Sequence, residues 1–230
     1  PFNQKQGVLT VPFSDEGNCL VYGSTGNGKT TFLTTTAYSL LKNHTADELN
    51  LYIMDFGSET LKVFEKAPQV GGVIVSSDTE KTINFFKMLQ KEVEIRRNLF
   101  SEYGGDYKSY CKNSGKTIPN IVVLLNNYSG FSEQFEDLID AFSLLSRDGV
   151  KYGIYFVATA SNTNAIRYVT TQNFKTTYAM QMNDTTDYSV VLGKTDGLIP
   201  SKFKGRGLVN MGNVFEFQTA FCQDAEDMTE

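Results

Sequence analysis

The stretch NCLVYGSTGNGKTTFL, Asn18 to Leu33, decides the fold of this chain. Its first part, up to Tyr22, is an apolar run of the kind that forms a buried strand. The segment Gly23 to Thr30, which we call the phosphate loop, fits the pattern G-x-x-x-x-G-K-[ST]. A helical pattern, KTTFLTTTAYSLLKN, follows directly. A strand that leads through such a loop into a helix is the unit that binds phosphate at a helix amino terminus in α/β domains.

Each residue type in the phosphate loop suits the binding of a nucleotide. Gly23, Gly26 and Gly28 permit tight turns and let backbone N–H groups approach phosphate oxygens. Lys29 is expected to reach the β- and γ-phosphates, and Thr30 to offer its hydroxyl to magnesium. A glycine-rich turn that holds no ligand is the alternative. The predicted nucleotide-binding residues are Gly23, Ser24, Thr25, Gly26, Asn27, Gly28, Lys29, Thr30 and Thr31.

The rest of the chain alternates apolar strand candidates with helical patterns. A long helix is predicted from Asp78 to Phe100, with Ile83 among its core residues, and a shorter apolar stripe runs from Phe131 to Leu145. After Ala160 the pattern indicates extended segments around turns, as a hairpin or an addition to a sheet edge. We predict one α/β domain over residues 1–230, with a mostly parallel central sheet flanked by helices. The predicted core strands are NCLVYG, NLYIMDF, GGVIVSS, NIVVLLN and GIYFVATA.

Composition excludes several classes of function. The chain has 230 residues, a formal net charge of −5 and one histidine, His44, so a Ser-His pair or a histidine metal site is not expected. Its three cysteines lie far apart, which favours a reducing cytosol over a disulfide framework. No basic stripe is present, which argues against a nucleic-acid partner. The apolar runs are shorter than the roughly 18 residues of a membrane span. The start at Pro1 suggests a fragment of a longer protein.

The acids that normally complete a phosphate-loop enzyme are missing where they are expected. In such enzymes an apolar strand ends in one acid that holds magnesium through water and a second that orients the attacking water. In NIVVLLNNY these two positions are Asn126 and Asn127. An amide resembles a carboxylate in shape, but it lacks the negative charge that magnesium prefers and it cannot take a proton. We therefore predict hydrolysis slowed by orders of magnitude unless another acid substitutes.

Asp55 is the acid that could substitute, because LYIMDFG also ends an apolar strand with a carboxylate. If that strand lay beside the strand of the phosphate loop, Asp55 could hold magnesium. A position two or three strands away would put it roughly 10–15 Å off. Residue patterns alone do not give the strand order. The alternative role for Asp55 is to cap the turn that follows it.

With these residues the chain resembles the FtsK/SpoIIIE family of RecA-like motor ATPases over nearly its whole length. Within that family, the segments DFGSETLKVFEKAPQVGGVI, GFSEQFE and AIRYVTTQNF are most similar to the ATPase domains of type VII secretion coupling proteins, and above all to the last ATPase domain of the EssC proteins of firmicutes. The other matching features are the acid and glycine of LYIMDFGS, the pair Arg96-Arg97, the loop and strand YCKNSGKTIPNIVVLLNNY, Arg147 before YGIYFVATA, Asn173-Phe174 and Gly205-Arg206-Gly207.

The resemblance implies a RecA-like phosphate-loop NTPase in which the Asp55 strand lies farther out than the Asn126 strand. It implies ATP and Mg²⁺ as ligands and neighbouring ATPase domains of the same chain as partners. It further implies a ring oligomer, secreted WXG100-type or related proteins as substrates, and a place on the cytoplasmic side of a cell-membrane protein. DNA-pumping members carry D-E at positions 126 and 127, and a glutamine that would sense the γ-phosphate at the position of Ala160. The resemblance therefore implies the architecture and the secretion role, without fast hydrolysis.

Ring-forming motors complete their sites with an arginine from a neighbouring subunit, which stabilises charge in the transition state. Arg147, Arg167 and Arg206 are the candidates in this chain, with Arg147 preferred. The alternative for each is a solvated or locally paired surface arginine.

Three hypotheses of function follow from these patterns. The leading one is a nucleotide-binding, hydrolysis-impaired domain of a type VII secretion motor that acts in substrate recognition or in the regulation of export. The second is an active ATP-hydrolysing translocase domain, in which Asp55 or a neighbour's residue fills the vacant role. The third is an interaction module whose phosphate loop is empty. A DNA pump is disfavoured by the acidic charge and the missing acids.

Overall fold

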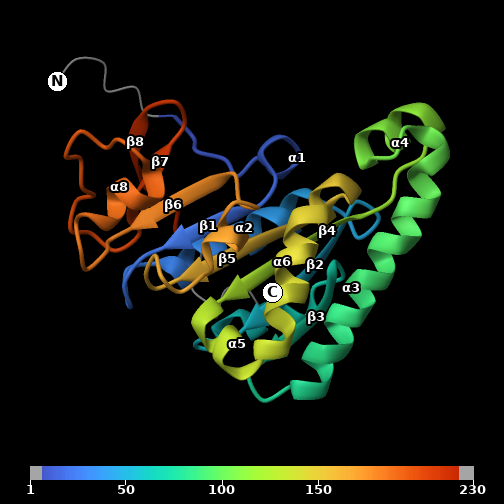
Figure 1. Cartoon of the computed structure of the whole chain (residues 1–230), viewed down its shortest axis with the longest axis horizontal. Helices are drawn as coiled ribbons and strands as arrows, with labels where there is room; N and C mark the ends of the chain where they lie inside the picture. Colours follow the sequence, from blue (N-terminus) through green and yellow to red (C-terminus); the bar gives the residue numbers. More distant parts are fainter. Residues whose placement is uncertain (1–6, 223–230) are drawn as a thin grey trace.

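An eight-stranded sheet organises the computed structural model, which describes residues 7–222 (Figure 1). The strands lie in the order β3-β2-β4-β5-β1-β6-β7-β8. Strands β1 to β6 pair in parallel, and β7 and β8 are added antiparallel at one edge. This arrangement confirms the predicted fold class and its C-terminal hairpin. The strands are β1 (Cys19–Tyr22), β2 (Leu49–Asp55), β3 (Val70–Val75), β4 (Asn120–Asn126), β5 (Ile154–Ala160), β6 (Thr176–Met180), β7 (Arg206–Asn210) and β8 (Val214–Gln218).

Helices cover both faces of the sheet, and this explains why the central strands are apolar without interruption. On one face α2 (Lys29–Asn43) buries Phe32 and Leu33 against β2, β4 and β5. On the other face α3 (Thr79–Phe100), α5 (Tyr128–Gln134) and α6 (Ile139–Asp148) bury a cluster of aromatic rings. The shorter helices are α1 (Phe13–Glu16), η1 (Thr60–Lys66), η2 (Ser101–Tyr103), α4 (Tyr107–Ser114), η3 (Glu136–Leu138), η4 (Gly149–Tyr152), α7 (Tyr168–Thr171) and α8 (Asp187–Leu192).

The predicted helices are present, with two corrections. The helix predicted from Asp78 spans Thr79–Phe100, but Ile83 is 36% exposed, and Thr82 and Phe85 are buried beside the predicted core residue Phe86. The stripe between Phe131 and Leu145 is buried but divides into two helices, because Phe135 has non-helical backbone angles. Within residues 7–222 no helix is both long enough and apolar enough to cross a membrane.

Arg96 shows how the long helix is fixed to the sheet. The side chain of this arginine is 2% exposed, and each of its three nitrogens donates a hydrogen bond. The acceptors are Glu92 Oε1 at 2.7 Å, the carbonyl of Tyr152 at 2.9 Å and the carbonyl of Pro119 at 2.8 Å. A buried guanidinium with all three nitrogens engaged orients α3 against the chain segments that enter β4 and β5.

We expect Arg96→Ala to lower the free energy of unfolding by about 3 kcal/mol, because the substitution leaves the buried carbonyl of Tyr152, the partly buried carbonyl of Pro119 and Glu92 without their partner. Arg97→Ala is the matched control, since Arg97 is exposed and makes one long contact, 3.4 Å, to the hydroxyl of Tyr152. Its cost should stay below about 1 kcal/mol. Denaturant titration of the two variants measures the difference, and equal costs would contradict the anchoring role of Arg96.

Candidate nucleotide site

The phosphate loop lies at the carboxyl end of β1 and is held from both sides. Gly23 N–H donates to the carbonyl of Ala160 at the end of β5, at 3.1 Å. Ser24 N–H donates to the carbonyl of Gln181, just after β6, at 2.8 Å. β6 was not among the predicted strands, because its two threonines interrupt the apolar pattern. The loop is therefore fixed by the two strands that neighbour β1 in the sheet.

The backbone of the loop suits a phosphate group. Gly26 and Gly28 adopt positive φ angles of 83° and 102°, which glycine reaches without strain. Within residues 7–222 the N–H groups of Gly26, Asn27 and Gly28 donate no hydrogen bond, so they are free to meet an anion. They lie next to the amino terminus of α2, where the helix dipole favours negative charge.

Lys29 curls back over the loop. Its ammonium group donates to the carbonyl of Gly23 at 2.6 Å and to that of Ser24 at 3.2 Å. Burial lowers the pKa of Lys29, because the charged form loses hydration. A phosphate group in the loop would give this cation a partner of opposite charge, so Lys29 fits the role predicted for it. Thr30 and Thr31 lie in the first turn of α2 and are both half-buried.

The outer side of the loop is covered by the C-terminal hairpin. Gly205 N–H donates to the carbonyl of Asn27 at 3.2 Å. A Cβ on Gly28 would lie 2.8 Å from both Cα and N of Gly205, so the two glycines are in direct backbone contact. This contact assigns a structural reason to the late Gly-Arg-Gly segment that the sequence showed without explaining.

The two side chains at the carboxyl end of β4, Asn126 and Asn127, are neutral amides that bond to the end of β2. Asn126 is buried, and its amide nitrogen donates to Asp55 Oδ1 at 2.8 Å. Its amide oxygen accepts from the hydroxyl of Thr159 at 3.2 Å, and the same hydroxyl accepts from Asn127 N–H at 2.8 Å. The side chain of Asn127 donates to the carbonyl of Phe56 at 2.9 Å. Both amide nitrogens therefore face the β2 side, away from the phosphate loop.

Asp55 lies too far out to hold magnesium at the loop. Its strand, β2, is three strand spacings from β1, with β4 and β5 between them, which corresponds to roughly 14 Å. The side chain is fully buried and accepts from Gly57 N–H at 3.1 Å and Leu61 N–H at 3.2 Å, besides Asn126. This placement fits the alternative role of capping the following turn and goes against a direct contact with magnesium.

The strand ends around the phosphate loop carry no acidic side chain within residues 7–222. The strands whose carboxyl ends lie around it, β1, β4, β5 and β6, end in Tyr22, Asn126, Ala160 and Met180, and the residue directly after each is not an acid. Within residues 7–222 no cluster of acidic, histidine or cysteine residues could hold a metal ion. The arrangement can bind a triphosphate through backbone donors and one lysine. Among the described residues, none at these strand ends could take a proton from an attacking water.

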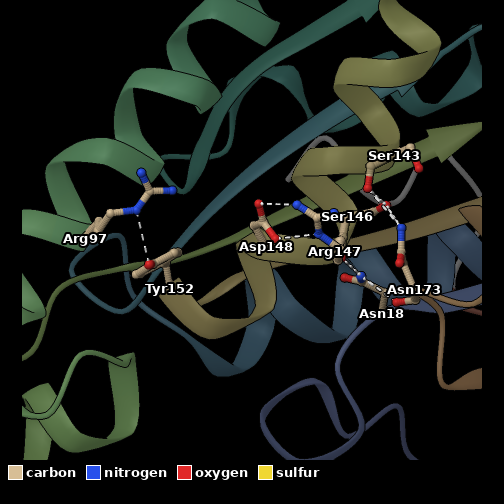
Figure 2. A network of polar contacts seen from close by, with 8 residues as sticks. All are labelled: Asn18, Arg97, Ser143, Ser146, Arg147, Asp148, Tyr152 and Asn173. Carbon is tan, nitrogen blue, oxygen red and sulfur yellow. Dashed lines mark hydrogen bonds and ion pairs between the residues drawn. The ribbon is translucent and has the colours of Figure 1, made fainter.

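The candidate arginines are each paired locally. Arg147, at the end of α6, makes a two-point contact to Asp148 at 2.7 and 3.1 Å, and its side chain is 61% exposed (Figure 2). Arg167 bonds Asp140 at 3.0 Å on the surface, and Arg206 lies 4.0 Å from Glu216. Local pairing is what the alternative interpretation of these arginines predicts.

Arg147 also lies beside the amino ends of the strands, whereas the phosphate loop of the same chain lies at their carboxyl ends. It lines a hollow of about 350 Å³ together with Asn18, which precedes β1 at the amino end of the strands. Asn18, a residue that the sequence did not single out, donates to the carbonyls of Ser146 and Asn173 (Figure 2). Its side-chain oxygen also accepts from Phe156 N–H. Because the loop sits at the carboxyl end of β1, Arg147 could act only on the site of a neighbouring subunit.

Comparisons with a family profile and with known proteins point to the same family. The profile of the FtsK/SpoIIIE family matches residues 4–194. The type VII secretion system protein EssC of Staphylococcus aureus (strain MRSA252) is 26% identical over 226 residues, and the ESX secretion system protein YukB of Bacillus subtilis (strain 168) is 29% identical over 229. These matches cover 96% and 99% of this chain, and the chain spans 15% of the length of each relative.

Solved structures agree. ATPases 2 and 3 of EssC from Geobacillus thermodenitrificans superpose with a TM-score of 0.85 at 26% identity, over 94% of this chain and 43% of that one. ATPases 2 and 3 of Thermomonospora curvata EccC, solved with a signal sequence peptide, superpose with a TM-score of 0.88 at 24% identity, over 100% of this chain and 44% of that one. The second likeness supports the fold alone. The predicted resemblance is confirmed.

Restoring an acid at the end of β4 should destabilise the protein in a pH-dependent way. Asn126→Asp puts a carboxylate against Asp55 where the amide now bonds it at 2.8 Å. Two such carboxylates cannot both ionise, so one keeps a proton and its pKa in the folded variant rises above the value of about 3.9 in the unfolded chain. The folded variant then binds more protons than the unfolded one, and its stability falls as the pH rises.

We expect the destabilisation of Asn126→Asp to grow by about 2 kcal/mol between pH 4 and pH 8, which corresponds to a shift of about 1.5 pKa units. Chemical denaturation across that range measures it. Asn127→Asp is the control, because its side chain is partly exposed and faces a carbonyl group instead of a carboxylate. A pH-independent cost for Asn126→Asp would contradict the bridge to Asp55.

Proposed function

This chain belongs to the FtsK/SpoIIIE family, and on that premise we propose that it is an ATPase-fold domain of a type VII secretion protein that binds ATP and hydrolyses it slowly or not at all. The observation that carries the proposal is the contrast between two strand ends. The phosphate loop keeps its free N–H groups and its lysine, whereas the end of β4 holds Asn126 in a bridge to Asp55.

The residues that would hold the triphosphate are those of the loop. The N–H groups of Gly26 to Gly28 would donate to the β-phosphate, with Lys29 moving from the carbonyl of Gly23 to the β- and γ-phosphates. Thr30 would offer its hydroxyl to Mg²⁺, which when bound would offset the negative charge of the phosphates. The remaining magnesium ligands would be phosphate oxygens and water, because the neighbouring strand ends carry no carboxylate within the described residues. We expect magnesium to bind less tightly than at a site with an acid.

Slow hydrolysis follows from the side chains at the end of β4. Asn126 has both ends of its amide engaged, and the amide nitrogen of Asn127 is bonded to Phe56. Ala160 has no polar side chain to sense the γ-phosphate. General-base catalysis contributes about 10²–10⁴-fold to rates, and the strand ends around the loop have no residue to supply that contribution.

The wider role is inferred from the relatives. Homologous chains contain several ATPase domains, so we propose neighbouring domains of the same polypeptide as partners, on the cytoplasmic side of the membrane and within a ring. The EccC structure carries a signal sequence peptide, so we propose secreted proteins of the WXG100 type or related proteins as the cargo. In this scheme bound nucleotide sets the conformation of the domain and thereby regulates substrate recognition or export.

Calorimetric titration with ATP tests the proposal, with and without Mg²⁺. We expect the native chain to bind ATP and Lys29→Ala to lose at least about tenfold in affinity, since the lysine–phosphate contact is a charge-assisted hydrogen bond. Lys42→Ala is the matched control, because Lys42 is an exposed lysine at the far end of the same helix. Overnight incubation should release phosphate at least about a hundredfold more slowly than an enzyme with its acid pair.

Other outcomes would replace the proposal. Magnesium-dependent turnover that is lost in Lys29→Ala would favour an active translocase. Absence of binding to the native chain, together with binding of a signal peptide that is indifferent to ATP and to Lys29, would favour an interaction module with an empty loop.

A further inference from the structure

Residues 198–205 form the last part of the irregular connection between α8 and β7. They carry three exposed apolar side chains, Leu198, Ile199 and Phe203, at 40%, 52% and 67% exposure. Because such a segment has no repeating backbone ladder, its order depends on individual hydrogen bonds. One of these leads to β8, where Ser201 N–H donates to Glu216 Oε1 at 2.6 Å. Others lead toward the phosphate loop.

Gln181, the residue directly after β6, holds the phosphate loop through its backbone carbonyl. That carbonyl accepts from Ser24 N–H at 2.8 Å and from the hydroxyl of Ser24 at 3.0 Å. The amide nitrogen of Asn27 lies 3.5 Å from the same oxygen and donates to Ser24 Oγ at 2.6 Å. Three donors of the loop therefore converge on one carbonyl group.

The side chain of Gln181 bonds residues 198–205. Its amide nitrogen donates to the carbonyl of Ser201 at 2.7 Å and lies 3.5 Å from the carbonyl of Phe203. A glutamine amide has two N–H donors, so it can serve both carbonyl groups. A single residue thus bonds the phosphate loop through its backbone and the segment before β7 through its side chain.

A second connection closes a ring of hydrogen bonds between the loop and this segment. Gly205 N–H donates to the carbonyl of Asn27 at 3.2 Å. Asn27 is therefore tied to residues 198–205 in two ways, directly through its carbonyl and by its side chain through Ser24 and Gln181. Its own N–H is one of the free donors of the loop within residues 7–222. A phosphate group that accepts from this N–H would fix Asn27 and with it both connections.

We propose that Gln181 is a positioning residue through which a phosphate group bound in the loop restrains residues 198–205. This inference rests on the proposed binding of ATP at the phosphate loop. It adds that occupancy of the loop changes the order of a surface segment on the C-terminal side of the sheet, by way of one side chain. Such coupling needs no change of shape, because a ligand that restrains one part of a hydrogen-bonded ring also restrains the rest.

Amide hydrogen exchange, resolved by residue with NMR, tests the coupling. Inorganic tripolyphosphate with Mg²⁺ is the probe, because it can occupy the loop and has no nucleoside that could touch residues 198–205 directly. We expect exchange of the Ser201 and Phe203 N–H groups to slow at least about fivefold at saturation, the lower end of coupling between two sites. Both groups donate hydrogen bonds, to Glu216 at 2.6 Å and to the carbonyl of Ser201 at 2.7 Å, so their exchange measures local opening.

Gln181→Met separates the side chain of this residue from its carbonyl. Methionine keeps the length of the side chain but has no N–H donor, and the backbone carbonyl that holds the loop is unchanged. The variant should bind tripolyphosphate in a calorimetric titration and lose the slowing at Ser201 and Phe203. Gln218→Met is the matched control, because Gln218 Nε2 donates to the carbonyl of Lys204 at 3.0 Å, in the same segment, but from β8. This control should keep the slowing.

Each other result has a defined meaning. A native chain that binds tripolyphosphate without slower exchange at Ser201 and Phe203 would overturn the coupling and leave the proposed function standing. The same holds if Gln181→Met keeps the slowing, if Gln218→Met loses it equally, or if the native chain binds ATP but not tripolyphosphate. A native chain that binds neither ligand would overturn both. Thermal unfolding without ligand verifies that the variants fold, as expected for a half-buried Gln181 and an exposed Gln218.

Discussion

Two backbone hydrogen bonds, from Gly23 to Ala160 and from Ser24 to Gln181, are the constraint on which the rest of the site depends. They fix the entry of the phosphate loop to both strands that neighbour β1, so contacts within the protein order the loop. Free N–H groups in a preformed loop bind an anion without the cost of ordering the chain. The same constraint brings the Gln181 side chain to the carbonyl of Ser201, at 2.7 Å, and so ties the hairpin to the loop.

A second constraint separates binding from catalysis. The loop and the end of β4 are two strand spacings apart, with β5 between them. Amides in place of acids at the end of β4 therefore do not alter the backbone contacts of the phosphate loop. The amide of Asn126 has instead become a structural element, since it satisfies the buried carboxylate of Asp55. The substitution Asn126→Asp would place two carboxylates side by side, and their repulsion disfavours an acid at this strand end.

Much of this could be predicted from the sequence, and the exceptions have physical causes. The glycine pattern and the continuous apolar strands located the loop and five core strands, because both signals are local. β6 was missed because TTYAM is short and half polar, although it supplies one wall of the loop. The bridge from Asn126 to Asp55 joins residues 71 positions apart, and the contact of Gly28 with Gly205 spans the chain; neither leaves a local pattern. Asn18 looks like any polar residue before a strand.

Together these constraints give the physical basis of the proposed function, in which ATP is bound and hydrolysed slowly or not at all. In the proposed function, binding would use backbone donors and one lysine on one side of β5, and catalysis would need charge on the other side. A ligand that binds only the folded state stabilises it by about 2.7 kcal/mol at a concentration of 100 Kd, and it does so without hydrolysis. Because Gly205 is in contact with Gly28, a ligand that stabilises the phosphate loop would also stabilise the start of the hairpin. In the proposed function, a bound nucleotide would therefore stabilise the C-terminal edge of the sheet as well as the phosphate loop.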